Sequence, residues 1–157
     1  MSHTSALLAE LPPHRAEQLM RAAREVTFPA GTRIFAEGHR AQRFWVLRSG
    51  TVALDSHVPG RRAPVVETLS HGDLLGWSWL FPPYTWHLGA RAVTEVRAYE
   101  FDAGAVRVLM RDDPGLDAAV TRYVAEVVAE RLKATRMRLL DLYGPHGSGP
   151  HGSGTAI

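Results

Sequence analysis

The sequence contains no cysteine, which excludes disulfide bonds, thiol nucleophiles and thiolate metal sites. It has no apolar run near the ~18 residues that a transmembrane helix requires, and its first residues lack the apolar core of a signal peptide. An excess of one charge is also missing, because 18 cations face 16 anions and the net charge is only +2. These absences predict a cytoplasmic protein without a membrane partner and without the electrostatic footprint of a nucleic-acid-binding protein.

The residues that are present suffice for one globular domain. The chain has 157 residues, of which 45% are hydrophobic, so it can bury a sizeable core. Residues 1–26 are predicted to be a helical segment in two pieces. Pro12 and Pro13 end the first piece, and over residues 14–25 apolar side chains recur at three- and four-residue intervals.

Residues 27–101 show the period of strands instead. Short runs of β-branched and aromatic residues alternate with turns that contain Gly and Pro, which is typical of an antiparallel sandwich or barrel. The predicted strands cover residues 33–36, 44–47, 51–55, 64–69 and 90–101.

Residues 102–143 return to a helical pattern. A short helix is expected over residues 102–110. Asp112, Asp113 and Pro114 then favour the start of a long helix, because acidic caps and proline suit a first turn.

The long helix carries two apolar stripes. One has heptad-like steps, interrupted by Glu130, and predicts a homodimer interface over residues 113–143. Its members are Leu116, Val120, Tyr123, Val127, Ala134 and Met137. The second stripe comprises Val124, Val128, Leu132, Leu139 and Leu142. The alternative is that the helix lies in a broad groove of its own domain and leaves no face for a second copy.

The segment 144–157 contains the motif PHGSG twice. Repeats of Gly, Ser and Pro cannot bury enough apolar surface to become ordered, so a flexible tail is predicted. His146 and His151 within it are interpreted as incidental rather than as metal ligands.

The most unusual stretch is residues 72–92, GDLLGWSWLFPPYTWHLGARA, which holds three of the four tryptophans. Glycine and paired prolines disfavour a regular helix or strand there. A long loop with bulky aromatic residues inside a compact domain indicates either a binding site or a plug of core.

Four motifs are spaced along the chain: PAGTRIFAEG at residues 29–38, VLRSGTV at 46–52, GDLLG at 72–76 and ARAVTEV at 90–96. With the order of helices and strands, this pattern resembles the cyclic-nucleotide-binding domain of the catabolite-activator (Crp/Fnr-like) type. The resemblance implies a mainly β fold with flanking helices, namely a cupin-like jelly-roll barrel with N-terminal helices and a long C-terminal helix.

The resemblance also implies where a nucleotide would bind, and the sequence departs from it there. Nucleotide-binding members have a Glu for the ribose directly after the glycine that corresponds to Gly76, and an Arg-Ser/Thr-Ala step for the cyclic phosphate. This sequence has Trp77 in place of the Glu, and Trp86, His87 and Leu88 in place of the phosphate-binding step. A buried phosphate needs strong donors, so ordinary binding of cAMP or cGMP is not expected. The candidate pocket residues are Gly76, Trp77, Ser78, Trp86, His87 and Leu88.

Three interpretations of the aromatic loop stay open. The rings can fill the old pocket and give a structural version of the domain without a ligand. They can line a remodelled pocket for an aromatic or apolar small molecule. Alternatively, some rings in residues 77–88 face outward and form a docking patch for a protein partner, since Trp and Tyr are favoured at interface hot spots.

DNA binding and catalysis are not expected. Transcription regulators of the family carry a helix-turn-helix domain after the long helix, whereas only 14 residues follow Tyr143 here. An enzymatic metal site is disfavoured because the histidines at positions 39, 57, 71 and 87 lack the paired spacing of metal ligands.

The predicted function is that of a non-enzymatic regulatory or partner-binding module that forms a homodimer and needs no cofactor or metal. The alternative is a sensor of an unknown small molecule, such as a nucleotide, in a remodelled aromatic pocket.

Overall fold

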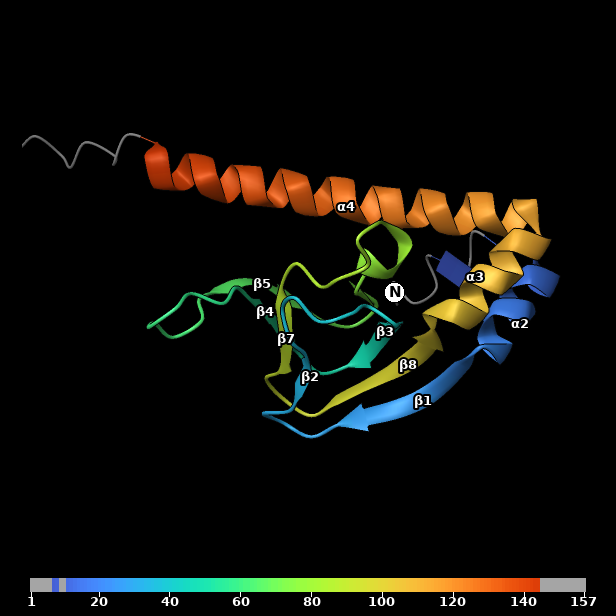
Figure 1. Cartoon of the computed structure of the whole chain (residues 1–157), viewed down its shortest axis with the longest axis horizontal. Coiled ribbons are helices and arrows are strands. Elements are labelled where there is room, and N and C mark those ends of the chain that lie inside the picture. Colours follow the sequence, from blue (N-terminus) through green and yellow to red (C-terminus); the bar gives the residue numbers. More distant parts are fainter. Residues whose placement is uncertain (1–6, 9–10, 145–157) are drawn as a thin grey trace, which may run out of the picture. The chain divides into compact units, whose positions relative to one another are not determined.

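The computed structural model describes residues 7–8 and 11–144 of the chain. In these residues eight strands form two antiparallel sheets of four strands each, with the orders β1-β8-β3-β6 and β2-β7-β4-β5 (Figure 1). The predicted jelly-roll fold with flanking helices and a long C-terminal helix is thereby confirmed. The predicted tail from residue 145 onward, with His146 and His151, lies outside the described residues.

The elements follow one another closely. The first sheet consists of β1 (Ala23–Phe28), β8 (Val96–Asp102), β3 (Arg43–Ser49) and β6 (Leu74–Leu75). The second consists of β2 (Arg33–Phe35), β7 (Gly89–Ala92), β4 (Val52–Asp55) and β5 (Val65–Leu69). The helices are α2 (Pro13–Arg21), α3 (Ala103–Asp112), α4 (Pro114–Tyr143) and the short 3-10 helix η1 (Ser78–Leu80).

The second piece of the N-terminal helix is shorter than predicted. It ends at Arg21, and Ala23–Phe28 pair along their whole length with β8. The prediction of helix up to residue 25 is therefore wrong over its last residues, and the barrel begins inside the segment 1–26. Pairing with β8 outweighs the helical spacing here, since a local propensity of a few tenths of a kcal/mol per residue is easily overridden by a strand ladder. The ion pair between Arg24 and Glu100, opposite each other in the register, adds to that pairing.

The predicted strand 90–101 is two strands that belong to different sheets. The chain turns at residues 93–95, so β7 continues the second sheet and β8 the first. Val93 N–H donates to the carbonyl of Thr51, and the Thr94 hydroxyl accepts from the N–H of Thr51. This turn lies directly against Gly50, where a side chain would collide with the carbonyl of Glu95.

The two C-terminal helices begin as predicted, at acidic caps. The Asp102 carboxylate accepts from the N–H of Ala105, and Asp113 Oδ1 accepts from the N–H of Gly115 and of Leu116. Arg15 of α2 donates to Asp113 Oδ2 at 2.9 Å. That hydrogen bond holds the pKa of Asp113 below its ordinary value, so the carboxylate stays ionised while it caps α4.

Helix α4 crosses from one compact unit of the chain, Met1–Val124, into a second, Ala125–Ile157. Within the first unit, the side chains of Leu116, Val120 and Tyr123 are buried in the chain itself. Half of the predicted dimer interface is therefore core, and the alternative of packing on its own domain holds for this part. An apolar stripe in the sequence does not indicate which surface will cover it. Here the core of the same chain covers the first half of the stripe. Among the described residues, no helix combines the length and apolar character that spanning a bilayer requires.

The contact at Gly50 gives a stability prediction with a matched control. Gly50 and Gly60 both have positive φ, +89° and +73°, but a Cβ on Gly50 would lie 2.2 Å from the Glu95 carbonyl oxygen, whereas one on Gly60 meets nothing. Gly60→Ala should lower the free energy of unfolding by the strain alone, about 1–2 kcal/mol. Gly50→Ala should cost about 1–3 kcal/mol more, because the β7–β8 turn must move. Equal losses in urea unfolding would show that the turn accommodates a side chain.

Candidate functional site

The space between the two sheets is filled by stacked aromatic rings. Trp86 lies on Phe35 of β2 with ring centroids 3.9 Å apart, and Phe35 stacks on Trp45 of β3 at 5.7 Å. Phe28 of β1 closes the group edge-on to Trp45 at 6.2 Å. Because Phe35 and Trp45 come from opposite sheets, Trp86 completes a stack that spans the interior of the barrel. Stacked and edge-on pairs of this kind add about 0.5–1.5 kcal/mol each beyond the area that they bury.

The backbone around Trp86 fixes the direction of its side chain. Trp86 N–H donates to the His39 carbonyl, and the Trp86 carbonyl accepts from the N–H of Gly38. The N–H of Ala41 donates to the Tyr84 carbonyl, and Arg40 and Thr85 form an isolated β-bridge. Residues 84–86 are therefore paired with the turn after β2, although Tyr84 itself has a left-handed backbone with φ +59°. Within this segment Tyr84 is exposed and Trp86 is buried, so Trp86 is the residue that points inward.

Gly76 is the floor against which Trp86 packs. A Cβ on Gly76 would lie 2.7 Å from the ring of Trp86, and the residue has φ +92°. Both the close approach and the positive φ require glycine. The glycine that matches the family motif is thus retained here, where it now accommodates a side chain of the protein itself.

The six predicted pocket residues do not form one cluster. Gly76 and Trp86 meet inside the barrel, and Ser78 is buried as the first residue of η1. Trp77 and His87 lie together nearer the surface, with ring centroids 5.4 Å apart, and Leu88 is half-buried beside them in the chain. Trp77, expected at the ribose position with Trp86 at the phosphate position, is separate from the interior stack.

The other aromatic residues of the loop divide between core and surface. Trp79 is fully buried and stacks on Phe44 at 4.6 Å, which is the opposite face of β3 from Trp45. Phe81 and Tyr84 are 41% and 37% exposed, and Phe81 stands edge-on to Trp77. Side chains alternate between the two faces of β3, so Phe44 contacts Trp79 on one face while its neighbour Trp45 contacts Phe35 on the other.

Helix α3 holds the loop from outside. Arg107 Nη1 donates to the carbonyl of Trp79 at 2.7 Å, and its guanidinium lies 5.3 Å from the ring centroid of Tyr84. A cation over an aromatic face contributes about 0.5–1 kcal/mol at an exposed site. The exposed part of the loop is therefore restrained at both of these residues.

Glu100 is a site residue that the sequence analysis missed. Its carboxylate is buried, accepts from the indole Nε1 of Trp45 at 2.9 Å, and pairs with Arg24 at 2.6 Å and Arg43 at 3.5 Å. A buried charge is tolerated only when it is paired and hydrogen-bonded. Glu100 therefore orients Trp45, and through it the interior stack. The sequence held one sign of this role: Glu100 alternates with Val96 and Ala98, so it lies on the same, apolar face of the strand as they do.

A second buried carboxylate, Asp55, lies on the outer face of the second sheet. Arg33 donates to Asp55 Oδ1 at 2.8 Å, and this hydrogen bond raises the pKa of the Arg33 guanidinium further above its ordinary value. A Cβ on Gly89 would lie 2.5 Å from that same oxygen. Gly89, the first residue of β7, therefore has to lack a side chain, because the ion pair between Arg33 and Asp55 occupies the space above it.

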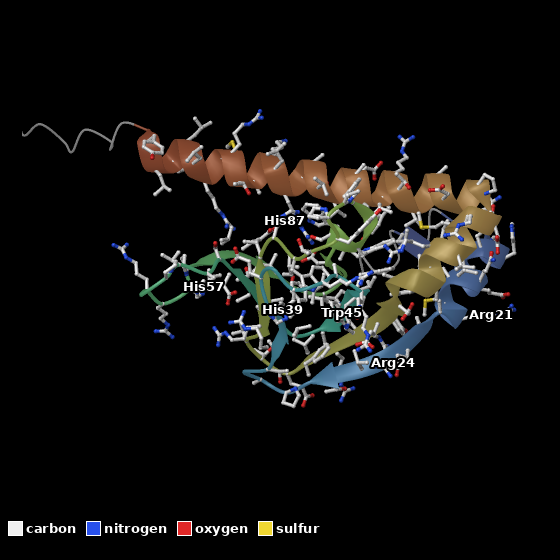
Figure 2. All side chains as sticks on the ribbon, viewed as in Figure 1. Arg21, Arg24, His39, Trp45, His57 and His87 are labelled. Atoms are coloured by element: carbon white, nitrogen blue, oxygen red, sulfur yellow. The ribbon has the colours of Figure 1, made fainter. Side chains whose placement is uncertain are left out.

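The histidines come from separate loops. Figure 2 shows His39 after β2, His57 between β4 and β5, and His87 in the aromatic loop. The N–H of His57 donates to Glu37 Oε2 at 2.6 Å. In the part of the chain that the structure describes, no group of three His, Cys, Asp or Glu side chains is placed to hold a metal ion. The expectation that the protein uses no metal or cofactor stays a prediction.

Comparisons with known proteins agree with this architecture. Residues 25–113 match the family model described as "Cyclic nucleotide-binding domain". A CRP-like cAMP-activated global transcriptional regulator of Mycobacterium tuberculosis is 31% identical over 83% of this chain and 56% of its own length. The chain thus spans about half the length of the curated relatives that it matches.

Solved structures show the same fold. The N-terminal domain of a transcriptional regulator from Streptomyces coelicolor is 27% identical, with a TM-score of 0.65 over 82% of this chain and 89% of that one. The catabolite activator protein of Thermus thermophilus, at 23% identity, has a TM-score of 0.68 over 87% of this chain and 62% of its own.

The two classes of tryptophan in the loop predict different costs of truncation. Trp86→Ala should lower the free energy of unfolding by about 3–5 kcal/mol, because it empties the space between the sheets. Trp77→Ala should cost clearly less, since its ring is half-buried and touches only Phe81 and His87 among the ring contacts described. Chemical denaturation of both variants measures this, and a cost for Trp77→Ala as large as that for Trp86→Ala would contradict the assignment of Trp86 as the interior ring.

Proposed function

This chain belongs to the cyclic nucleotide-binding domain family, of the Crp/Fnr-like type, and we propose that it is a non-enzymatic regulatory module that acts through a partner protein and does not bind cAMP or cGMP in the usual way. The observation that carries the proposal is the place of Trp86, stacked on Phe35 between the sheets and against Gly76.

Displacing Trp86 would be costly. A tryptophan buries roughly 150–250 Å², and at about 25 cal/mol per Å² its exposure costs about 4–6 kcal/mol. That corresponds to about three to four decades of affinity. A cyclic nucleotide that entered the barrel would also lack the ribose carboxylate and the phosphate guanidinium that the resemblance implies, each worth about 1.5–3 kcal/mol as a charged hydrogen bond.

The partner surface that we propose is the outer part of the loop 77–88. Trp77, Phe81, Tyr84 and His87 lie there at or near the surface, and aromatic residues are enriched among the few that dominate binding energy at interfaces. The backbone pairing of residues 84–86 with residues 38–41, together with Arg107, keeps this surface ordered before a partner binds. Such order reduces the entropy cost of association.

The second candidate is a small-molecule sensor with a remodelled aromatic pocket. It is favoured by the 31% identity to a regulator described as cAMP-activated. In that case Trp86 would leave the interior when the ligand enters, and Phe35 and Trp45 would stack on the ligand instead. Both candidates are regulatory, as are the curated relatives, and neither involves catalysis. Direct binding of DNA is not part of either proposal.

We also propose a homodimer through the second unit of the chain. Beyond Val124 the apolar side chains of α4 are half-buried at Val127 and Val128 and exposed farther along, including Leu132 at 58%, Leu139 at 52% and Leu142 at 72%. With Val128 and Thr135 they form alternating four- and three-residue steps, the pattern of a coiled-coil seam. The rest of the predicted interface, Val127, Ala134 and Met137, lies on another face, which Glu130 and Asp141 interrupt. The proposed interface is therefore the second stripe.

A titration of tryptophan fluorescence tests the pocket. Addition of cAMP, cGMP or cyclic di-GMP to the purified protein should give no saturable change up to millimolar concentration, because the interior is already filled. Isothermal calorimetry serves as the independent readout. A saturable micromolar response of the wild-type protein would overturn the first proposal and favour the sensor. If the Trp86→Phe variant then lost this fluorescence response, the response would be assigned to Trp86 and the ligand to the barrel interior.

Sedimentation tests the dimer. The double variant Leu132→Glu/Leu139→Glu should sediment at half the mass of the wild-type protein, since two charges per helix enter the apolar seam. Met137→Glu is the matched control, because Met137 is 56% exposed on the opposite face of the same helix, and it should remain dimeric. Dissociation by Met137→Glu alone would return the interface to the first stripe.

A further inference from the structure

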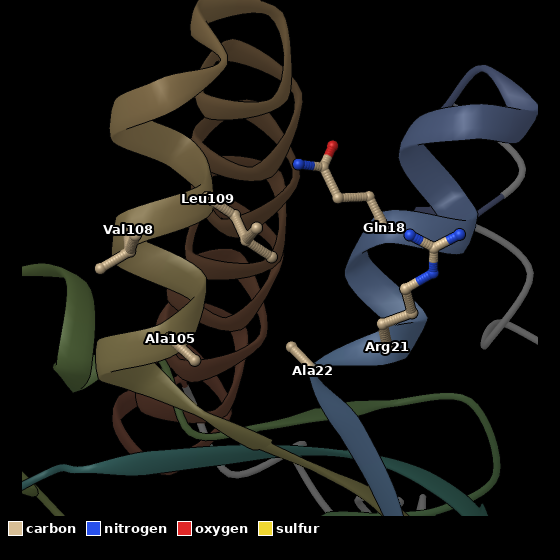
Figure 3. Close-up of a pocket in the computed structure, with 6 residues that line it drawn as sticks. All are labelled: Gln18, Arg21, Ala22, Ala105, Val108 and Leu109. Atoms are coloured by element: carbon tan, nitrogen blue, oxygen red, sulfur yellow. The ribbon is translucent and has the colours of Figure 1, made fainter.

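Outside the barrel, helices α2 and α3 leave a hollow of about 520 Å³ between them (Figure 3). Its wall is mostly apolar, with small alanine side chains and the exposed Val108, and Gln18 reaches over it from α2. The lining residues are Gln18, Arg21, Ala22, Ala105, Val108 and Leu109. None of them belongs to the aromatic loop or to the interior stack.

A second hollow of about 380 Å³ adjoins the first and is polar. Arg21 and Ala22 line both hollows, so the two meet at the end of α2. Figure 2 labels Arg21, the last residue of α2, and Arg24 on β1, the strand that follows it. The remaining lining residues of the second hollow are Ala23, Arg24, Arg43, Glu100 and Asp102.

Of the charged side chains that line the second hollow, Arg21 is the one whose guanidinium has no carboxylate partner among the described residues. Both carboxylates already have partners, because Glu100 pairs with Arg24 and Arg43, and Asp102 accepts from the N–H of Ala105. Among the described residues Arg21, in the last turn of α2, forms no ion pair. Arg21 lines both hollows, and Figure 3 shows its long side chain lying along α2, so an anion placed where the hollows meet would be within reach of its guanidinium after a change of rotamer.

We propose that the joined hollows are a binding site for a small amphiphilic carboxylate in free solution. Its apolar chain would lie between α2 and α3, and its carboxylate would pair with Arg21. Each hollow falls within the range of about 300–1,000 Å³ typical of small-molecule sites. The charge complementarity at one end and the apolar wall at the other match a ligand that is itself divided in this way. Glu100, which also bonds Trp45 of the interior stack, lines the second hollow, and the other lining residues are not part of that stack. The proposal does not depend on the function proposed above for the barrel.

Decanoate is the probe for the test, used below the concentration at which it forms micelles, and decan-1-ol is its uncharged counterpart. Calorimetry should show saturable binding of decanoate to the full chain, and amide NMR shifts should cluster at residues 18–22 and 105–109. Decan-1-ol should bind about two- to fivefold weaker, because it lacks the charged contact with the exposed Arg21.

Two variants separate the two halves of the site. Arg21→Gln should weaken decanoate about two- to fivefold, the range of an exposed ion pair, and leave decan-1-ol unchanged, and Val108→Glu should weaken both probes. The matched controls are Arg97→Gln and Val93→Glu, exposed residues at the β7–β8 end of the sheets, which should change neither. Circular dichroism confirms that each variant is folded.

The proposal is overturned if the wild-type protein does not bind decanoate, if Arg21→Gln and Val108→Glu bind it as tightly as the controls do, or if the amide shifts fall on the aromatic loop. Binding to phosphatidylglycerol vesicles without binding of free decanoate would also overturn it, and would indicate a lipid surface instead.

Discussion

Packing of Trp86 between the two sheets is the contact on which the rest of the structure depends. The ring rests on Phe35 from one sheet and near Trp45 from the other, so it joins the two layers. Gly76 must lack a side chain for the ring to fit, and the segment 84–86 must pair with residues 38–41 to point the ring inward. Protein interiors are packed as densely as organic crystals, so a ligand that took the place of Trp86 would have to displace its ring from Phe35 and Gly76.

Buried carboxylates support this packing from two directions. Glu100 bonds the indole of Trp45 and is neutralised by arginines at the edge of the sheet. Asp55 bonds Arg33 across Gly89, where the loop enters β7. Each buried carboxylate is tolerated because its partners satisfy it, and loss of Arg33 would leave the charge of Asp55 uncompensated. Such groups fix which strand register and which ring orientation the apolar core adopts, a role that apolar contacts alone, which lack direction, do not fulfil.

The two ends of α4 show how one helix can serve two purposes. Its first turns bury Leu116, Val120 and Val124 within the domain, and its later turns expose leucines on one face. The helix therefore links the stability of the barrel to any contact made by the second unit. Arg107 of α3, the helix that precedes α4, donates a hydrogen bond to the aromatic loop at the carbonyl of Trp79.

The sequence by itself determined the fold class, because glycine-punctuated turns, alternating strands and acidic helix caps are local signals that depend on neighbours along the chain. The resemblance also predicts the loss of the nucleotide-binding side chains at Trp77 and Trp86, and this stays a prediction. Only the tertiary structure decided that residues 23–28 form a strand, that Leu116 and Val120 are core, and that Trp86 faces inward while Trp77 does not. The physical reason is the same in each case: an apolar residue gains free energy from any dry surface, and the sequence does not say which surface will cover it. The role of Glu100 was hidden for a related reason, because a buried charge is stable only through partners from other strands, which are far away in the sequence.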